Sequence, residues 1–379
     1  MAEALRLPAE QRYPEEFAAL LANDRDPRPS NWRLSPRSVE TFLLGSQGKA
    51  LSYEEGGVAK SVVIRKKFYG DDVLVQRAIV TLASDRGLLL IGEPGTAKSW
   101  LSEHLAAAVS GDSLLTIQGS AGITEDQIKY SWNYALLLAE GPSKRALVPA
   151  PLYLGMRDGK VVRFEELTRT PHEVQDTLLS CMSDKVLTVP ELAGDGSGDG
   201  FVLAQRGFNV VGTANTRDRG VNEMSSALKR RFNFETVPPV EDLNEEIKIV
   251  REQVTGLLEG SAARAATLPD EVLELLVTTF HELRGGKTSD GVKVDRGNGV
   301  MSTAEAVSVG FHSALYASFF AESKVEPEHV VINLAGAAVK DSAEDLKVLR
   351  NYWDVAVKPR ATKDVGLWKA YYKARSYLK

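Results

Sequence analysis

Residues 88–105, with the sequence LLLIGEPGTAKSWLSEHL, restrict the fold of this chain more than any other segment. An apolar run ends in the loop GEPGTAKS and an amphipathic stretch follows, which is the strand–loop–helix order of a phosphate-binding loop. In such a loop, backbone N–H groups and a helix N-terminus converge on phosphates, a lysine reaches the β and γ oxygens, and a hydroxyl holds magnesium. The segment therefore predicts a nucleotide site within an α/β fold.

The loop supplies each of these parts. Gly92 and Gly95 allow the backbone to turn tightly around the phosphates, Lys98 provides the positive charge, and Ser99 is the predicted metal ligand. Ala97 stands where the common pattern has a second glycine. We expect Ala97 to lie where the chain is already entering the helix, a conformation open to any L-residue, so that its methyl group costs little.

Short apolar runs alternate with amphipathic stretches between about residues 62 and 237. GLLLIG, SLLTIQG, KVVRFEE and FNVVGTAN are strand candidates, whereas KSWLSEHLAAAVS and PHEVQDTLLSCMSD have helical spacing. This alternation predicts a parallel sheet covered by helices. The tract GDGSGDG lies between two further strand-like segments and predicts a hairpin.

The two ends of the chain have a different pattern. Two helical segments, PEEFAALLAND and SVETFLLG, flank a proline-rich stretch near the N-terminus and are expected to pack on a larger body. After residue 240 the strand signals fade, and three long segments with helical spacing predict a helical domain. We therefore expect an N-terminal helical appendage (1–60), an α/β core (61–238) and a helical domain with a C-terminal extension (239–379).

Polar residues follow two of the predicted strands. Glu165 and Glu166 come directly after VVRF, at a strand's carboxyl end, where open α/β sheets bind ligands. One carboxylate would hold magnesium through water, and the other would polarise the attacking water. Asn215 follows a further apolar strand and could orient that water. Arg230 and Arg231 follow a short helix and could stabilise the transferring phosphoryl group at a neighbouring subunit's nucleotide.

In this order, GEPGTAKS, VVRFEEL, GTAN and LKRRF resemble the Walker A, Walker B, sensor 1 and arginine-finger motifs of the AAA+ ATPases. Within them the chain resembles the MoxR family, because KFYGDDVLVQRAIVTLA is similar to the segment that leads into that family's core, with Gly70 near the adenine. The resemblance covers about residues 60–320. It implies an α/β P-loop AAA+ core with a parallel sheet flanked by helices, followed by a helical lid domain.

The resemblance also implies roles for individual residues. Glu166 is implied as the catalytic base, Asn215 as the sensor and Arg231 as the finger, with Arg230 as its substitute. Ser99 is implied as a magnesium ligand, and Glu165 holds the ion through water. The residues expected to bind ATP are Gly70, Gly92, Glu93, Pro94, Gly95, Thr96, Ala97, Lys98, Ser99 and Trp100.

Two residues depart from the family's pattern. Glu165 stands where an aspartate is usual, and Ala304 stands where the lid helix commonly has a sensor 2 arginine. The sequence therefore does not predict whether the lid position is coupled to the nucleotide state, and hydrolysis is expected to be slow without a partner. These departures favour an alternative function, a nucleotide-gated assembly scaffold with little intrinsic hydrolysis.

The main expectation remains an ATPase that uses ATP and Mg²⁺ and assembles into a homo-oligomer, a hexameric ring. The resemblance implies chaperone-like remodelling of a client protein, beside a partner with a von Willebrand A domain. A formal net charge of −5 gives no basic field, so nucleic acid is not expected as a partner. No run approaches about 18 apolar residues, so no membrane partner is expected. The single cysteine, Cys181, and the absence of a signal-peptide pattern predict a cytoplasmic protein.

Overall fold

The computed structural model describes residues 4, 6–195, 200–215, 222–296, 301–339, 343–364 and 366–378. Contacts divide the chain into two compact units. One consists of Met1–Gly92 and Ala97–Val237, and the other of Glu93–Thr96 and Pro238–Lys379.

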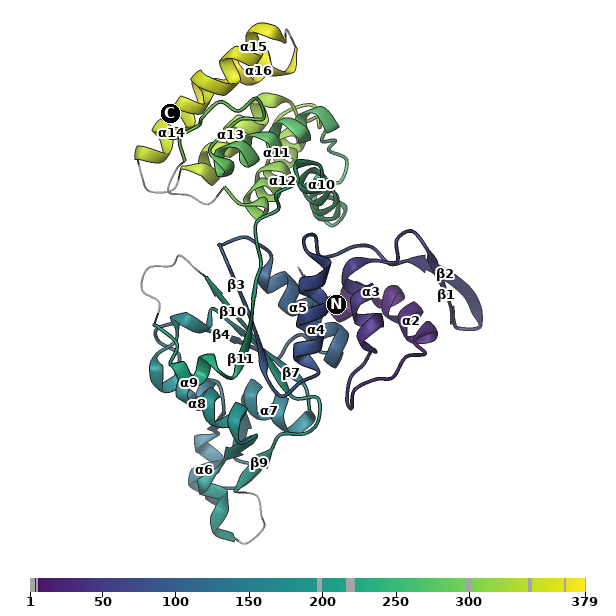
Figure 1. Ribbon diagram of the computed structural model, residues 1–379, viewed down its shortest axis with the longest axis vertical. Coiled ribbons are helices and arrows are strands. Elements are labelled where there is room, and N and C mark those ends of the chain that lie inside the picture. Colours follow the sequence, from purple (N-terminus) through teal and green to yellow (C-terminus); the bar gives the residue numbers. More distant parts are fainter. Residues whose placement is uncertain are drawn as a thin grey trace. The chain divides into compact units, whose positions relative to one another are not determined.

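A five-stranded parallel sheet forms the centre of the first unit (Figure 1). Its strand order is β11-β3-β10-β7-β4. The strands are β3 (Gly87–Gly92), β4 (Thr116–Gln118), β7 (Val161–Glu165), β10 (Asn209–Asn215) and β11 (Phe232–Thr236). The predicted parallel sheet is therefore confirmed, and the four apolar segments proposed as strands provide four of its members.

Helices cover both faces of this sheet, which explains why its strands are apolar at nearly every position. Successive residues of a strand point to opposite faces. Leu88 and Leu90 accordingly belong to one buried cluster, with α4 and α5, whereas Leu89 belongs to another, with α7, α8 and α9. These helices are α4 (Asp72–Leu82), α5 (Lys98–Ser110), α7 (Pro151–Asp158), α8 (His172–Ser183) and α9 (Ser226–Lys229).

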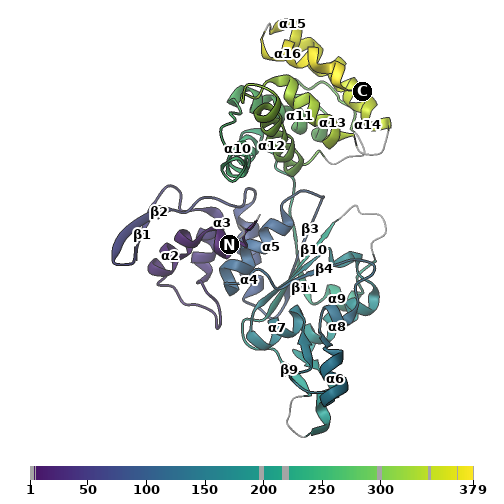
Figure 2. The same cartoon turned by 180° about the vertical axis from the view of Figure 1, so that it is seen from behind.

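Two insertions extend the core away from the sheet (Figure 2). The first contains β5 (Tyr130–Trp132), α6 (Tyr134–Glu140) and β6 (Leu147–Pro149), and its two strands pair antiparallel. The second is the predicted hairpin, in which β8 (Val186–Thr188) pairs antiparallel with β9 (Phe201–Leu203). Residues 196–199 of its GDGSGDG tract lie outside the described residues.

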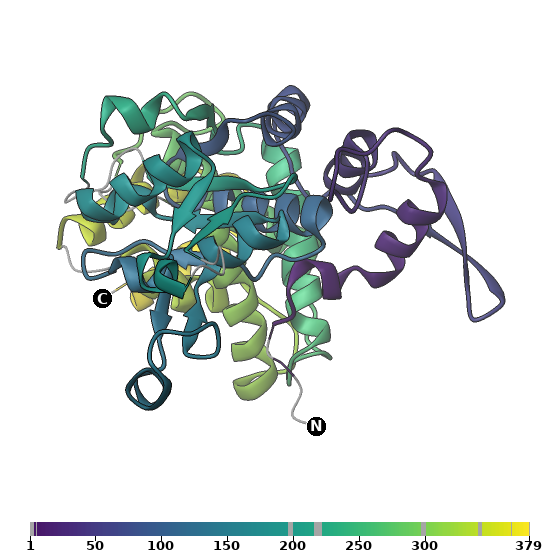
Figure 3. The same cartoon turned by 90° about the horizontal axis from the view of Figure 1, so that it is seen from below.

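The N-terminal segment contains both predicted helices and a hairpin that the sequence analysis missed. Its elements are α1 (Ala9–Arg12), α2 (Pro14–Asn23), α3 (Pro36–Leu44), β1 (Ala50–Glu55) and β2 (Val58–Val63). The hairpin β1–β2 projects from the first unit, and its strands are mostly exposed (Figure 3). Its two-residue turn is Gly56–Gly57, with φ of 60° and 80°. A Gly-Gly pair between β-rich segments is a hairpin signal, so the sequence did contain this information.

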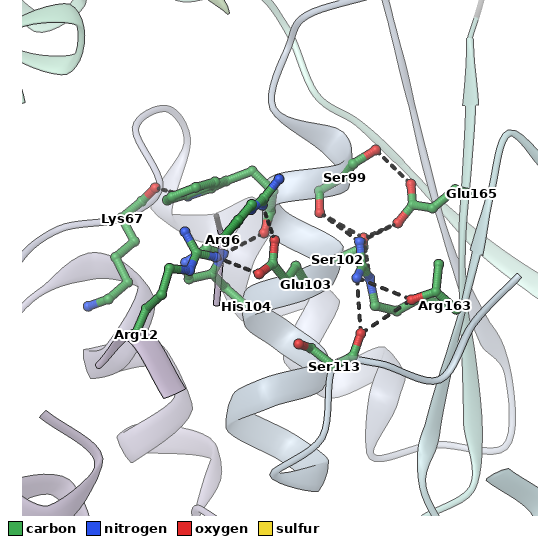
Figure 4. A network of polar contacts seen from close by, with 12 residues as sticks. Arg6, Arg12, Lys67, Ser99, Ser102, Glu103, His104, Ser113, Arg163 and Glu165 are labelled. Atoms are coloured by element: carbon green, nitrogen blue, oxygen red, sulfur yellow. Dashed lines mark hydrogen bonds and ion pairs between the residues drawn. The ribbon is translucent and has the colours of Figure 1, made fainter. Parts of the chain in front are cut away.

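The N-terminal segment packs directly on α5. Phe42 of α3 lies in the same buried cluster as Leu101 and Leu105 of α5. Beside this apolar contact, the carboxylate of Glu103 accepts hydrogen bonds from Arg12 and from a second arginine, Arg6 (Figure 4). Apolar packing and charge pairing therefore both fix the segment to the helix that begins at the phosphate loop.

The second unit is helical in its described ranges after Pro238, which confirms the predicted helical C-terminal region. Its helices are α10 (Leu243–Glu259), α11 (Asp270–Gly285), α12 (Thr303–Phe320), α13 (Pro327–Ala338), α14 (Ala343–Tyr352), α15 (Lys358–Lys363) and α16 (Leu367–Lys373). Ser302 and Glu305 form a capping box that starts α12, and Ala304 is exposed in its first turn. In the part of the chain that the structure describes, no helix is long and apolar enough to cross a bilayer.

Candidate functional site

The phosphate loop connects the end of β3 to the start of α5. It runs through Glu93, Pro94, Gly95, Thr96 and Ala97. Gly95 has φ of 78°, a left-handed conformation that glycine adopts at no steric cost, and Thr96 Oγ1 donates to the carbonyl of Glu93 at 3.0 Å. Lys98, the first residue of α5, is only 6% exposed, and its Nζ donates to the carbonyl of Gly92 at 3.2 Å.

Ala97 does not have the helical conformation that we expected from the sequence. It precedes the first residue of α5 with φ of 64° and ψ of 20°, which is left-handed. The expectation was therefore wrong, because the turn into α5 requires positive φ at the position where the common pattern has glycine. An alanine side chain there places Cβ too close to the following carbonyl and costs about 1–2 kcal/mol.

We expect Ala97→Gly to raise the free energy of unfolding by roughly 0.5–1 kcal/mol. The glycine removes the left-handed strain but gains conformational freedom in the unfolded chain, which offsets about half of the benefit. Urea unfolding measures the change. Ala107→Gly, inside the same helix, is the control and should lower stability by about 1 kcal/mol or more. A loss of stability in Ala97→Gly would contradict the assignment of strain to this residue.

Glu165, at the end of β7, lies at the centre of a hydrogen-bond network (Figure 4). Its Oε2 accepts from Ser99 Oγ at 2.6 Å and from Thr213 Oγ1 at 2.7 Å. Its Oε1 accepts from Ser102 Oγ at 2.6 Å and from Arg163 Nη2 at 2.8 Å. Oε2 of Glu165 therefore faces the predicted metal ligand Ser99, whereas Oε1 faces Ser102 and Arg163.

The surroundings of Glu165 keep it charged. Burial by itself raises the pKa of this carboxyl group, but hydrogen bonds from Ser102 and Ser99 and the positive charge of Arg163 outweigh that effect. The pKa of Glu165 consequently lies below its ordinary value. A buried, ionised carboxylate beside a serine hydroxyl is a pair of oxygen donors of the kind that Mg²⁺ prefers.

Glu166 follows in a left-handed conformation, with φ of 56° and ψ of 44°. Its backbone N–H donates to Thr213 Oγ1 at 3.0 Å. The Nδ2 of Asn215 donates to both carboxylate oxygens of Glu166, at 2.9 and 3.0 Å. Non-glycine residues in this region are strained and occur preferentially at functional sites. The carboxylate of Glu166 is thus held by Asn215.

Strand order explains why these side chains meet. The sheet places β10 between β3 and β7, and all three strands are parallel. Asn215 is the direct partner of Gly92 in the register, so the sensor candidate lies beside the start of the phosphate loop. Ser99, Glu165, Glu166 and Asn215 are therefore brought together at the carboxyl edge of the sheet, as the sequence predicted for the ends of parallel strands.

Two further residues predicted to bind ATP, Trp100 and Gly70, lie outside the loop itself. The Nε1 of Trp100 donates to the carbonyl of Lys67 at 2.9 Å, and its ring lies 4.8 Å from the guanidinium of Arg12 and 4.2 Å from the ring of His104. The side chain of Trp100 therefore packs against the N-terminal segment. Gly70, with φ of 143°, lies in the bend that precedes α4.

Arg230 and Arg231 lie near the amino-terminal ends of β11 and β3, whereas this chain's own phosphate loop follows the carboxyl end of β3. Arg231 precedes β11, whose first residue, Phe232, pairs with Gly87 at the start of β3. The Nε of Arg231 donates to Ser183 Oγ at 2.7 Å, and both arginines are exposed. The length of β3 separates them from Gly92, roughly 16 Å at the usual rise per residue.

Sequence reasoning missed three side chains of the site, Ser102, Arg163 and Thr213. A signal existed for two of them, because Arg163 and Thr213 each lie two residues before a predicted site residue on the same strand. Side chains two apart on a strand share a face, so a polar residue at that position in a buried strand points toward the same site.

Two family models and several relatives match this chain. A model of the AAA domain (dynein-related subfamily) matches residues 87–232, and a model of the YehL-like AAA+ ATPase C-terminal domain matches residues 244–379. The uncharacterised protein YehL of Escherichia coli is 51% identical over 376 residues, covering 98% of this chain and 97% of that protein.

More distant similarities are also present. The gas vesicle ATPase GvpN1 of Halobacterium salinarum is 28% identical over 181 residues, covering 45% of this chain and 51% of its own length. A crystal structure of NtrX from Brucella abortus in complex with ATP is 13% identical, with a TM-score of 0.44, and covers 83% of this chain and 69% of that one.

Proposed function

This chain belongs to the YehL-like AAA+ ATPases, of MoxR-like type, and from this premise we propose that it hydrolyses ATP to ADP and phosphate at the carboxyl edge of its sheet. The observation that carries the proposal is the pair formed by Glu166 and Asn215 beside Gly92. A phosphate loop alone indicates nucleotide binding, whereas a positioned carboxylate next to it provides a general base.

The residues of the site have separable roles in this proposal. The backbone N–H groups of the loop and the ammonium group of Lys98 bind the phosphates of ATP. Glu166 takes the proton of the attacking water, and Asn215 fixes the direction of that carboxylate. Ser99 Oγ and Glu165 Oε2 are mutually oriented oxygen donors and would hold Mg²⁺, Glu165 through water. When bound, Mg²⁺ neutralises charge on the β and γ oxygens.

The position of Arg230 and Arg231 favours an oligomer. Because they lie near the amino-terminal ends of β11 and β3, about the length of β3 from their own phosphate loop, a role for them in hydrolysis would require a nucleotide held by another copy. A contact in which one surface meets a different surface of the next copy closes into a ring when the rotation allows it. We therefore propose a homo-oligomeric ring, a hexamer, with Arg231 as the finger and Arg230 as its substitute.

The wider biological role rests on the family resemblance. We propose a cytoplasmic, chaperone-like remodeller of client proteins or complexes, acting beside a protein with a von Willebrand A domain. The three-part division into 1–60, 61–238 and 239–379 is part of this proposal, with the last part moving as a lid. The alternative, a nucleotide-gated scaffold with little hydrolysis, follows from Glu165 and Ala304.

The test is steady-state ATP hydrolysis per subunit as a function of protein concentration. If Arg231 completes the site of a neighbouring copy, the rate per subunit rises with concentration until assembly is complete. Nucleotide binding without turnover at any concentration would favour the scaffold, and a rate independent of concentration down to a proven monomer would contradict the shared site. Binding of DNA or RNA at low salt would instead point to a nucleic-acid motor.

A further inference from the structure

Arg163 is a charged residue inside a strand that is otherwise buried. Its side chain, in the middle of β7, is 12% exposed. The guanidinium donates to five acceptors from three segments of the chain. These are Ser102 Oγ (3.1 Å, from Nε), Ser113 O (3.0 Å) and Thr116 Oγ1 (3.3 Å, both from Nη1), and Ser99 O (3.2 Å) and Glu165 Oε1 (2.8 Å, both from Nη2). Such a planar fork has one orientation in which all these contacts are made.

Arg163 joins the two residues that would bind the metal. One atom, Nη2, donates to the backbone carbonyl of Ser99 and to the carboxylate of Glu165. The guanidinium therefore ties the N-terminal turn of α5 to the end of β7. Ser102, one turn further along α5, donates to the same Oε1 and accepts from Arg163 Nε. Arg163 and Ser102 both donate to Oε1 of Glu165, the carboxylate oxygen that does not accept from Ser99.

These contacts restrict the side chain of Glu165, which is longer than the aspartate that is usual at this position. Glu165 has one methylene group and one rotatable bond more than aspartate, so its carboxylate has more orientations to lose when it is fixed. With Oε1 occupied by Arg163 and Ser102, only Oε2 remains directed at the Ser99 hydroxyl and Thr213. The contacts thus select one orientation of a flexible side chain.

We propose that Arg163, together with Ser102, is a positioning residue that holds Glu165 against Ser99 and so sets the affinity of the ATP site for its divalent cation. The inference rests on the proposed ATPase function and deepens it. It concerns residues to which the proposed mechanism assigns neither phosphate binding nor a part in the chemical step. Partners of this kind, which orient a metal's own ligands, typically change metal affinity about 10- to 100-fold when they are removed.

The experiment measures Mn²⁺ binding by electron paramagnetic resonance in the presence of a non-hydrolysable ATP analogue. Arg163→Gln should weaken Mn²⁺ binding about 10- to 100-fold. Arg163→Lys keeps the charge but loses the fork and should lie between this variant and the parent. Ser102→Ala should change the affinity in the same direction. Without metal, binding of the analogue to each variant should stay within about twofold of the parent.

Arg12→Gln is the matched control, because Arg12 also contacts α5, through Glu103, but does not reach Glu165. It should leave Mn²⁺ affinity unchanged. Parental Mn²⁺ affinity in both Arg163→Gln and Ser102→Ala, or an equal loss in Arg12→Gln, would overturn the positioning role while leaving the ATPase proposal intact. A parent that binds no nucleotide would overturn both.

Discussion

Glu166→Gln should lower the ATP turnover number about 100- to 10,000-fold, which is the usual contribution of a general base. The amide of glutamine has nearly the same shape as the carboxylate and can still accept a hydrogen bond from Asn215, but it cannot take a proton from water. The Kd for a fluorescent ATP analogue should therefore stay close to that of the parent. Steady-state phosphate release and equilibrium fluorescence titration measure the two quantities.

Glu173→Gln is the control for this variant. Glu173 lies in the first turn of α8, is exposed, and undergoes the same chemical change away from the site. It should retain parental turnover. Substantial turnover in Glu166→Gln would show that another group is the base, and loss of nucleotide binding would show that Glu166 acts in binding rather than in the chemical step.

Arg231→Ala should lower turnover about 1,000-fold or more while nucleotide binding remains, because an arginine finger stabilises charge mainly in the transition state. The position of Arg231 at the amino edge of the sheet allows a sharper test. A Glu166→Gln subunit still supplies an intact Arg231, and an Arg231→Ala subunit still supplies an intact Glu166. Mixing the two inactive variants should therefore rebuild active interfaces.

In an equal mixture with random assembly, about a quarter of the interfaces combine the two intact residues. Activity should rise toward about that share of the parental rate, if the sites act independently. Mixing Glu166→Gln with an Arg231→Ala, Glu166→Gln double variant is the control and should restore nothing. Failure of the first mixture, with assembly verified by light scattering, would exclude Arg231 as a residue shared between copies.

The fold was readable from the sequence because its strands are buried on both faces. GLLLIG and FNVVGTAN are continuous apolar runs that end in polar groups, and parallel strands align those ends at one edge. The grouping of Glu165, Glu166 and Asn215 followed from that rule alone. Their individual roles in catalysis remain predictions.

The parts that were missed depend on interactions that a local pattern does not contain. The contacts of Arg163 to Ser99 and Ser102 span 64 and 61 residues of sequence, so only the packing of α5 on β7 creates them. The conformation of Ala97 was misjudged for a different reason. Helix propensity favours alanine before Lys98, but the geometry of the loop requires a left-handed residue there, and tertiary structure overrides local preference.

The packing of the N-terminal segment on α5 limits which parts of this chain can be lost in evolution. The helix α5, which begins with Lys98 and Ser99, packs against Phe42 and is tied through Glu103 to Arg12. A lineage that lost the segment would expose the apolar side of α5 in the same step. We therefore expect the segment and the α/β core to be retained together among relatives of this chain.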